Sequence, residues 1–288
     1  MSGDYQPFTD GGPTSNRRGF LAGAGSVAGL ALLGNASALS SKPTDTVPAA
    51  SDTIDTPLPY TQLDPETAKE RGRKFYYAGE HCSQGSFHAI LSLLREEVGE
   101  PYTRIPSTIP FWSAGGGAGW GAVCGAVVGS NSAISMVEGP TGTTMKLTDE
   151  LQRWYTQHPF PSYDPPEDAG HITKTLPSAT PESILCHVSV TNWCTESGYA
   201  SGSEEATERC GRLTGETAAR AVELLNAQAE GRFGREAKSI LPSTVSAENG
   251  CRACHSAGTD FQTGQFTRGK MECLNCHTAA PHMPDSLK

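Results

Sequence analysis

Cysteine and histidine recur near the end of the chain in one fixed spacing. The pattern Cys-x-x-Cys-His occurs twice, first at Cys251 to His255 and again at Cys273 to His277. Two thiols at this spacing can add to the two vinyl groups on one edge of a haem, and the adjacent histidine then places its imidazole on the iron. We therefore predict two c-type haems. Their tethers are Cys251, Cys254, Cys273 and Cys276, and their proximal iron ligands are His255 and His277.

A zinc ribbon is the competing interpretation of the same four cysteines. Eighteen residues separate Cys254 from Cys273, and zinc ribbons use spacers of this length. Zinc coordination by two cysteine pairs does not need a histidine after each pair, whereas haem attachment does. The repeated histidine therefore favours two haems over zinc.

Each haem iron also needs an axial ligand on the face opposite its proximal histidine. We rank the distal candidates as His282 and His81 first, then His88 and His187. His158 and His171 fall in proline-rich stretches, so we expect them to be surface or hydrogen-bonded side chains. Two haems with histidine on both faces would be low-potential electron carriers without an open site for a substrate.

Five further cysteines lie outside these motifs, far apart in the sequence. They are Cys82, Cys124, Cys186, Cys194 and Cys210. The chain has nine cysteines, an odd number, so disulfides cannot use them all. Widely spaced cysteines can ligate an iron-sulfur cluster when four sulfurs converge in space. Disulfides are the alternative if the protein reaches an oxidising compartment.

The N-terminal residues have the features of an export signal. Arg17 and Arg18 precede a run rich in glycine, alanine and leucine, which ends in the small-residue sequence Ala36-Ser37-Ala38. This pattern predicts a twin-arginine signal over residues 1–38, followed by a linker over 39–62, and the alternative is a permanent N-terminal anchor. Twin-arginine export carries folded proteins, often with a cofactor inserted, which favours a cluster over disulfides. We expect a periplasmic or extracytoplasmic protein.

Charge and hydropathy exclude several partners. The formal net charge is −9, so the chain lacks the basic surface that a nucleic acid or an anionic membrane attracts. Beyond the signal, no stretch approaches the roughly 18 consecutive apolar residues of a membrane helix, so the mature form should have no membrane span.

The elements that carry these cysteines are predicted to be helices. Asp64 and Pro65 mark one helix start, Ser203 marks another, and apolar residues at three- and four-residue steps predict a helix over 81–98 with Cys82 in its first turn. Residues 145–157 also have a helical pattern. A further start is predicted at Thr180, with Pro181 as the first helical residue.

The resulting fold class is mainly α. We expect a single helical domain over residues 63–249, with long irregular loops, and a dihaem attachment segment over 250–288. The glycine-rich stretch around Cys124 predicts close backbone approach. Gly117-x-Gly119 is only a fragment of a nucleotide-binding fingerprint, and no clear strand precedes it.

Four segments together resemble a known family. "GEHCSQGSFHAIL", "GGGAGWGAVCGAVVG", "HVSVTNWC" and "ERCGRLTGETAARAVELLN" occur in that order before the two haem motifs, and the combination is similar to the split-Soret cytochromes c. The central part also resembles a wider redox-active family named for its pattern of a Cys, a Gly-Cys-Ala-x-x-Gly and two further Cys. Cys124 departs from that pattern, because here the cysteine precedes the glycine.

The resemblance implies a helical homodimer with two bis-histidine haems per subunit, stacked near the dimer interface, where a partner subunit could supply a sixth ligand. It also implies an iron-sulfur centre, for which we expect a [2Fe-2S] cluster. By position the expected ligands are Cys82, Cys124, Cys194 and Cys210, with Cys186 as a spare thiol or alternative ligand.

These expectations lead to one main functional hypothesis. The chain would carry electrons between the cluster, the haem pair and a redox partner protein whose identity the sequence does not reveal. The alternative is an enzyme, a haem- or cluster-dependent reductase of a small substrate. That activity would need an iron with an open coordination position.

Overall fold

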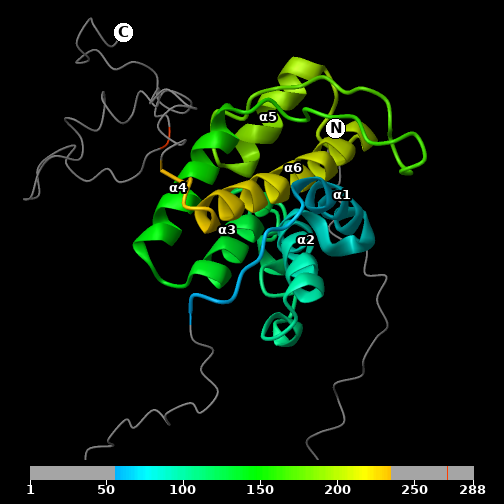
Figure 1. The fold of residues 1–288 in the computed structure, drawn as a ribbon. Helices are drawn as coiled ribbons and strands as arrows, with labels where there is room; N and C mark the ends of the chain where they lie inside the picture. The colour runs from blue at the N-terminus through cyan, green and yellow to red at the C-terminus, as the bar shows by residue number, and fades with distance from the viewer. Residues whose placement is uncertain (1–55, 235–270, 272–288) are drawn as a thin grey trace, which may run out of the picture. The chain divides into compact units, whose positions relative to one another are not determined.

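The structure is a computed structural model that describes residues 56–234 and Met271. This part of the chain is mainly helical, as predicted, and contains isolated β-bridges but no strand (Figure 1). The α-helices are α1 (Pro65–Phe75), α2 (His81–Glu97), α3 (Gly125–Glu138), α4 (Gly142–Gln157), α5 (Cys186–Ser197) and α6 (Glu204–Ala229). The export signal and both haem motifs lie outside the described residues.

Three short helical elements connect these helices. They are the π-helix η1 (Tyr76–Glu80) and the 3-10 helices η2 (Tyr102–Arg104) and η3 (Phe111–Ser113). In η1 the backbone of Gly79 has a φ of 89°, which a side-chain-bearing residue rarely adopts. This kink separates α1 from α2. Cys82 therefore lies in the first turn of α2, where the sequence predicts it.

Local capping chemistry accounts for the two helix starts that the sequence marks most clearly. The Asp64 carboxylate accepts a hydrogen bond from the Thr67 backbone N–H at 2.9 Å, and Pro65 follows as the first residue of α1. The Ser203 hydroxyl accepts from the Ala206 N–H at 3.1 Å at the start of α6. Both predicted starts are confirmed, because a cap needs only residues that are close in sequence.

The helix start predicted at Thr180 is wrong. Helix α5 begins at Cys186, and Leu185 directly before it has extended backbone. The Ile184 carbonyl accepts a hydrogen bond from the Cys124 N–H at 2.8 Å, and Leu185 forms an antiparallel bridge with Val123. Pairing with a distant segment therefore overrides the local cap and proline signals.

The longest helix, α6, crosses the middle of the described part and contacts α1, α2, α3 and α4 (Figure 1). Apolar side chains from these helices form the main core. Its fully buried members include Ile90, Leu94, Ile134, Leu147 and Val222. Helix α5 lies beside this core, with Trp193 buried and its indole N–H donating to the Pro177 carbonyl at 2.7 Å.

Glycines allow two pairs of helices to cross at backbone contact. Where α1 meets α6, a Cβ at Gly215 would lie 2.2 Å from the Lys69 carbonyl oxygen. Where α2 meets α3, a Cβ at Gly129 would lie 2.0 Å from the Ser83 carbonyl oxygen. Contacts this short exclude any side chain, so the glycines determine how closely these helices approach.

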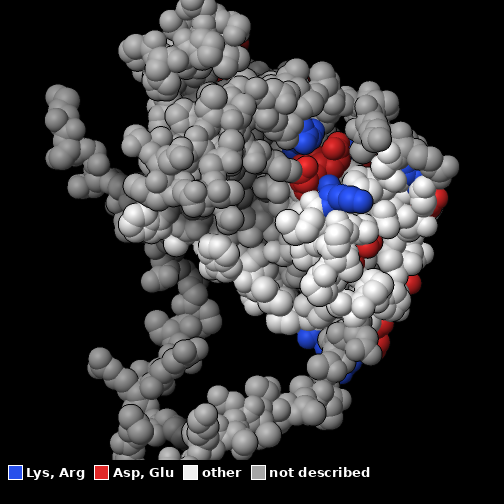
Figure 2. All heavy atoms as spheres, turned by 90° about the vertical axis from the view of Figure 1, so that its left-hand side faces the viewer, with Lys and Arg blue, Asp and Glu red and all other residues white. Residues whose placement is uncertain are grey.

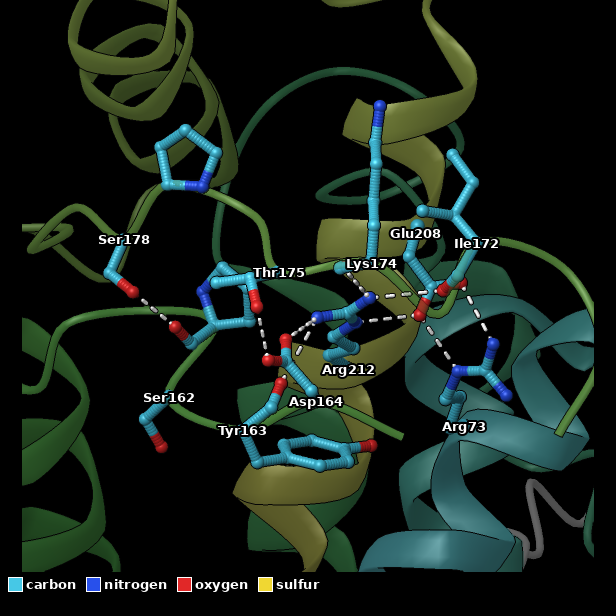
Figure 3. A network of polar contacts seen from close by, with 12 residues as sticks. Arg73, Ser162, Tyr163, Asp164, Ile172, Lys174, Thr175, Ser178, Glu208 and Arg212 are labelled. Carbon is cyan, nitrogen blue, oxygen red and sulfur yellow. Dashed lines mark hydrogen bonds and ion pairs between the residues drawn. The ribbon is translucent and has the colours of Figure 1, made fainter. Parts of the chain in front are cut away.

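Buried charges fasten the irregular segment between α4 and α5 to α6 (Figure 3). Glu208 of α6 accepts from Arg73 Nε at 2.8 Å and from Arg212 Nε at 2.7 Å, and all three side chains are almost wholly buried. The Nη1 and Nη2 atoms of Arg212 donate to Asp164 and to the carbonyl oxygens of Tyr163, Ile172 and Lys174. The carboxylate balances the arginines, and their remaining donors hold the loop.

One face of the described part carries charges of both signs. Figure 2 shows acidic and basic side chains gathered together on the side where α4 and the end of α6 lie in Figure 1. A cavity of about 340 Å³ near this end is lined by charged residues including Glu150, Arg220 and Glu223. This face therefore shows mixed pairs rather than an extended basic patch. Within the described residues, no helix is both long and apolar enough to cross a membrane.

Gly215→Ala should destabilise the fold by about 1–3 kcal/mol, because its methyl group would force α1 and α6 apart. Gly142→Ala is the matched control. A Cβ at that exposed helical position meets nothing within 4 Å, so its effect should stay within about 0.5 kcal/mol. Urea unfolding followed by far-UV circular dichroism measures both; equal stability of the two variants contradicts the prediction.

Glu208→Gln should cost about 3–5 kcal/mol of unfolding free energy, because it leaves two buried guanidinium groups without a carboxylate. Glu205→Gln, which removes an exposed pair with Lys174, should cost less than about 1 kcal/mol. The same unfolding measurement tests both. A Glu208→Gln protein as stable as the Glu205→Gln protein would show that the buried network contributes little.

Candidate metal centre

The first turn of α2 places Cys82 against the start of α3. Its Sγ atom lies 2.5 Å from the position that a Cβ on Gly125 would occupy, so glycine next to Cys124 makes room for the sulfur. The backbone of Gly115 forms a hydrogen bond with the same sulfur. The predicted close backbone approach around Cys124 is thus confirmed. The space beside Gly125 is filled by the sulfur of Cys82.

An antiparallel bridge brings Cys124 and Cys186 together. Cys124 is the N-cap of α3 and Cys186 is the first residue of α5. On either side of the bridge between Val123 and Leu185, the Cys124 N–H donates to Ile184 and the Cys186 N–H donates to Ala122 at 2.6 Å. Two helix N-termini therefore present their cysteines to the same region.

Cys210 completes this group from the first half of α6. The partly buried Tyr76 ring lies next to Gly211, the residue after Cys210, where a Cβ would be 3.2 Å from the ring. Burial raises the pKa of the Tyr76 hydroxyl, and the thiols of Cys210, Cys82 and Cys186 add to the rise. Cysteines from α2, α3, α5 and α6 thus converge. We call Cys82, Cys124, Cys186 and Cys210 the four-cysteine group.

Burial and the neighbouring thiols raise the pKa of three cysteines of this group. Burial, with further contributions from Cys124 and Cys210, raises the pKa of Cys82 to about 12. Burial also raises the pKa of Cys124 and of Cys186, and the thiols of Cys124, Cys210 and Cys82 add to the rise at Cys186. Thiols with pKa values raised in this way are poor nucleophiles. They suit a group whose own positive charge removes their protons, as a bound metal does.

Cys194 is placed differently. It lies two helical turns beyond Cys186 on α5, and Cys210 is the only thiol that contributes to the rise in its pKa. Cys82, Cys124, Cys186 and Cys210 therefore share one neighbourhood, whereas the ligand set expected from the sequence has Cys194 in place of Cys186. Cys194 borders this group on one side.

Polar side chains surround the four-cysteine group. The Tyr155 side chain forms a hydrogen bond with the Cys124 thiol, and its hydroxyl donates to the Ser189 hydroxyl at 3.0 Å. Arg209 is 2 % exposed and donates through Nη2 to the Ser189 hydroxyl at 2.7 Å. Its Nη1 lies 3.9 Å from Cys210 Sγ. A buried cation and a buried phenol therefore border the sulfurs.

Among the described residues, no three His, Cys, Asp or Glu side chains surround one point closely enough to hold a single metal ion. The cysteines are neighbours without enclosing one common centre. A two-iron cluster does not need three protein ligands around one point, because each iron takes two cysteine sulfurs and the inorganic sulfides complete its coordination.

The histidines named as distal haem candidates have distinct surroundings. His81 begins α2 with a φ of 53°, is partly buried, and has a pKa lowered by burial. His88 Nδ1 lies 2.9 Å from both Glu80 carboxylate oxygens, an arrangement that also orients metal-bound histidines. His187 is exposed, with its Cβ against Gly121. His282 lies outside the described residues.

The two histidines expected to be structural are found in such positions. His158 stacks on Trp154 and its Nε2 lies 3.0 Å from the Ser162 hydroxyl. His171 is exposed and stacks on Tyr77 with ring centroids 3.5 Å apart.

The chain is similar to known proteins over the segment that carries these cysteines. Residues 80–224 match the family described as "Putative redox-active protein (C_GCAxxG_C_C)", a range that includes all five cysteines discussed above. Over 218 residues the chain is 33% identical to "Split-Soret cytochrome c" of Desulfovibrio desulfuricans, covering 75% of this chain and 76% of that protein. The chain belongs to the split-Soret cytochrome c family.

A solved structure of a split-Soret cytochrome c has the same fold. It is described as "A novel iron centre in the split-Soret cytochrome c from Desulfovibrio desulfuricans ATCC 27774". The TM-score is 0.70 at 30% identity, and the match covers 80% of this chain and 93% of that chain. Cys124 precedes its glycine, whereas the family pattern has Gly before Cys. The chain still belongs to the family, and Cys124 lies at the start of α3.

Sequence reasoning did not find the polar residues around the sulfurs. Tyr76, Tyr155 and Arg209 have no recognisable spacing to the cysteines, and only Arg209 is adjacent to one of them. The sequence predicts Cys186 to be a spare thiol or an alternative ligand. Nothing in the sequence shows that residues 184–186 pair with 122–124. In the sequence, the one local indication of a polar neighbour to a sulfur is that Arg209 directly precedes Cys210.

Proposed function

We propose that this chain is an extracytoplasmic electron carrier that combines a thiolate-bound two-iron centre with two covalently attached haems. The observation that carries the proposal is the convergence of four cysteines from four helices beside a buried cation. A bound iron-sulfur centre supplies reversible one-electron transfer. The protein supplies the thiolates, a largely buried environment and the hydrogen bonds to sulfur.

For the ligands of the two-iron centre we propose Cys82, Cys124, Cys186 and Cys210. This set replaces the sequence-based expectation in one position, because Cys186 rather than Cys194 lies among the other three thiols. Cys82, Cys124 and Cys186 also lie at helix N-termini, where the helix dipole and free N–H groups stabilise negative charge on sulfur.

For the haems we retain Cys251, Cys254, Cys273 and Cys276 as tethers and His255 and His277 as proximal ligands. One described residue that is close in sequence to the second haem motif contacts the helical domain. The Ser183 hydroxyl lies 3.8 Å from Sδ of Met271, two residues before Cys273, and Ser183 is three residues before Cys186. Short distances favour electron exchange between the two kinds of centre. For the distal ligands we propose His282 and His81 first, then His88 and His187.

An exposed apolar surface beside Cys82 supports a protein partner. Trp120 is 87% exposed and Trp112 is 65% exposed, with Ile109 and Phe111 also exposed in the same connection. Exposed aromatic residues grouped in this way are typical of interaction surfaces. We propose a homodimer that passes electrons to a further redox protein, and twin-arginine export of the folded helical domain before haem attachment.

Metal and haem analysis of the purified full-length protein tests the proposal. We expect two haems per chain by the pyridine haemochrome assay and about two further irons, or about four irons in total. The Cys273→Ser, Cys276→Ser double variant should lose half of the haem and keep the non-haem iron. A wild-type protein without covalent haem, or without non-haem iron, would overturn the proposal.

Replacement of single cysteines tests the ligand set. Cys186→Ser should lose most of the non-haem iron and its visible absorption, because the four-cysteine group loses one sulfur. Cys194→Ser is the matched control on the same helix and should keep wild-type iron content. If Cys194→Ser loses the iron and Cys186→Ser retains it, the assignment of the fourth ligand is reversed.

A further inference from the structure

Arg209 is a buried cation that no carboxylate contacts among the described residues. It is 2 % exposed, and its partners are the Ser189 hydroxyl, the Ser189 carbonyl at 3.4 Å and the sulfur of Cys210. Its Nε has no hydrogen-bond partner. Each of these partners is neutral when the cysteine carries its proton, so the positive charge is unbalanced.

Two other buried arginines nearby differ from Arg209, because each of them contacts a carboxylate (Figure 3). Arg212, three residues further along α6, uses its guanidinium nitrogens to contact Glu208, Asp164 and backbone carbonyls. Arg73 shares the Glu208 carboxylate and donates to the carbonyls of Ala169 and Gly170. Consecutive residues on a helix point about 100° apart, so Arg209 lies away from Glu208. Its side chain instead reaches Cys210 and Ser189.

An unpaired charge in a protein interior costs several kcal/mol. The structure therefore calls for an anion within reach of Arg209. The acidic groups with the largest effect on the guanidinium are the thiols of Cys210 and Cys124 and the Tyr155 phenol. The thiol protons leave when a metal centre binds, and four thiolates would then outweigh the positive charge of a core made of two irons and two inorganic sulfides.

We infer that Arg209 is the counter-charge of the iron centre, a positioning residue that stabilises the reduced form and thereby raises the reduction potential. This inference rests on the proposed function, because it needs a centre ligated by the four-cysteine group. Reduction adds one electron from a one-electron donor and makes the centre more negative by one unit. A fixed positive charge next to Cys210 favours that change, so its removal lowers the potential.

The test is a redox titration of the full-length, haem- and iron-loaded protein, with dithionite as reductant and EPR of the non-haem centre as readout. Arg209→Gln should shift the midpoint potential of that centre to lower values at wild-type iron content. Arg209→Lys, which keeps the charge, should stay closer to wild type. Arg220→Gln is the charge control, because Arg220 lies about 17 Å further along α6 and should leave the potential unchanged.

The outcomes separate this inference from the proposed function. Wild-type protein without non-haem iron overturns the proposed function and the inference together. Full iron content in Arg209→Gln with an unshifted potential overturns the inference alone, because a purely structural arginine would produce that result. If Arg209→Gln does not fold, the midpoint potential of the Arg209→Lys protein tests the inference. A wild-type potential supports the role of the charge, and a large downward shift at full iron content contradicts it.

Discussion

The cysteines of this protein meet because the helices that carry them cross without a side chain between them. Gly125 leaves the space that the sulfur of Cys82 fills, and Gly129 allows α2 and α3 to pack at backbone distance. Any larger residue at these positions would separate Cys82 from Cys124. The geometry of the candidate metal centre therefore depends first on helix packing and only then on the cysteines themselves.

The buried charged side chains of α6 point to two different sides of the helix. Glu208 points toward the irregular loop and balances two arginines there, whereas Arg209 points toward the sulfurs. One helix thus fastens a long connection on one side and places a cation beside the four-cysteine group on the other. Buried charges are stable only when they are paired, so the charged residues on each side of α6 need partners of opposite charge. The charges on the loop side are paired within the chain, and the charge on the sulfur side would be paired by the anionic centre that we propose.

Features that depend on neighbouring residues could be predicted from the sequence. Asp64 and Ser203 cap their helices through contacts three residues away, and Cys82 lies in the first turn of α2 as its apolar periodicity implies. The family could also be recognised, because its cysteine segments are short and ordered. The start of α5 could not be predicted, since the extended backbone before Cys186 is stabilised by residues about sixty positions earlier in the chain.

The sequence by itself determined the haem chemistry that we propose, because Cys-x-x-Cys-His is complete within five consecutive residues and needs no partner from elsewhere. It also determined which residue types are available to bind a cluster. Tertiary structure alone decided which of the five cysteines lie together, and that Cys186 rather than Cys194 lies among them. The reason is physical: the sulfurs come from four helices, and only their packing and the pairing of residues 122–124 with 184–186 set the distances between them.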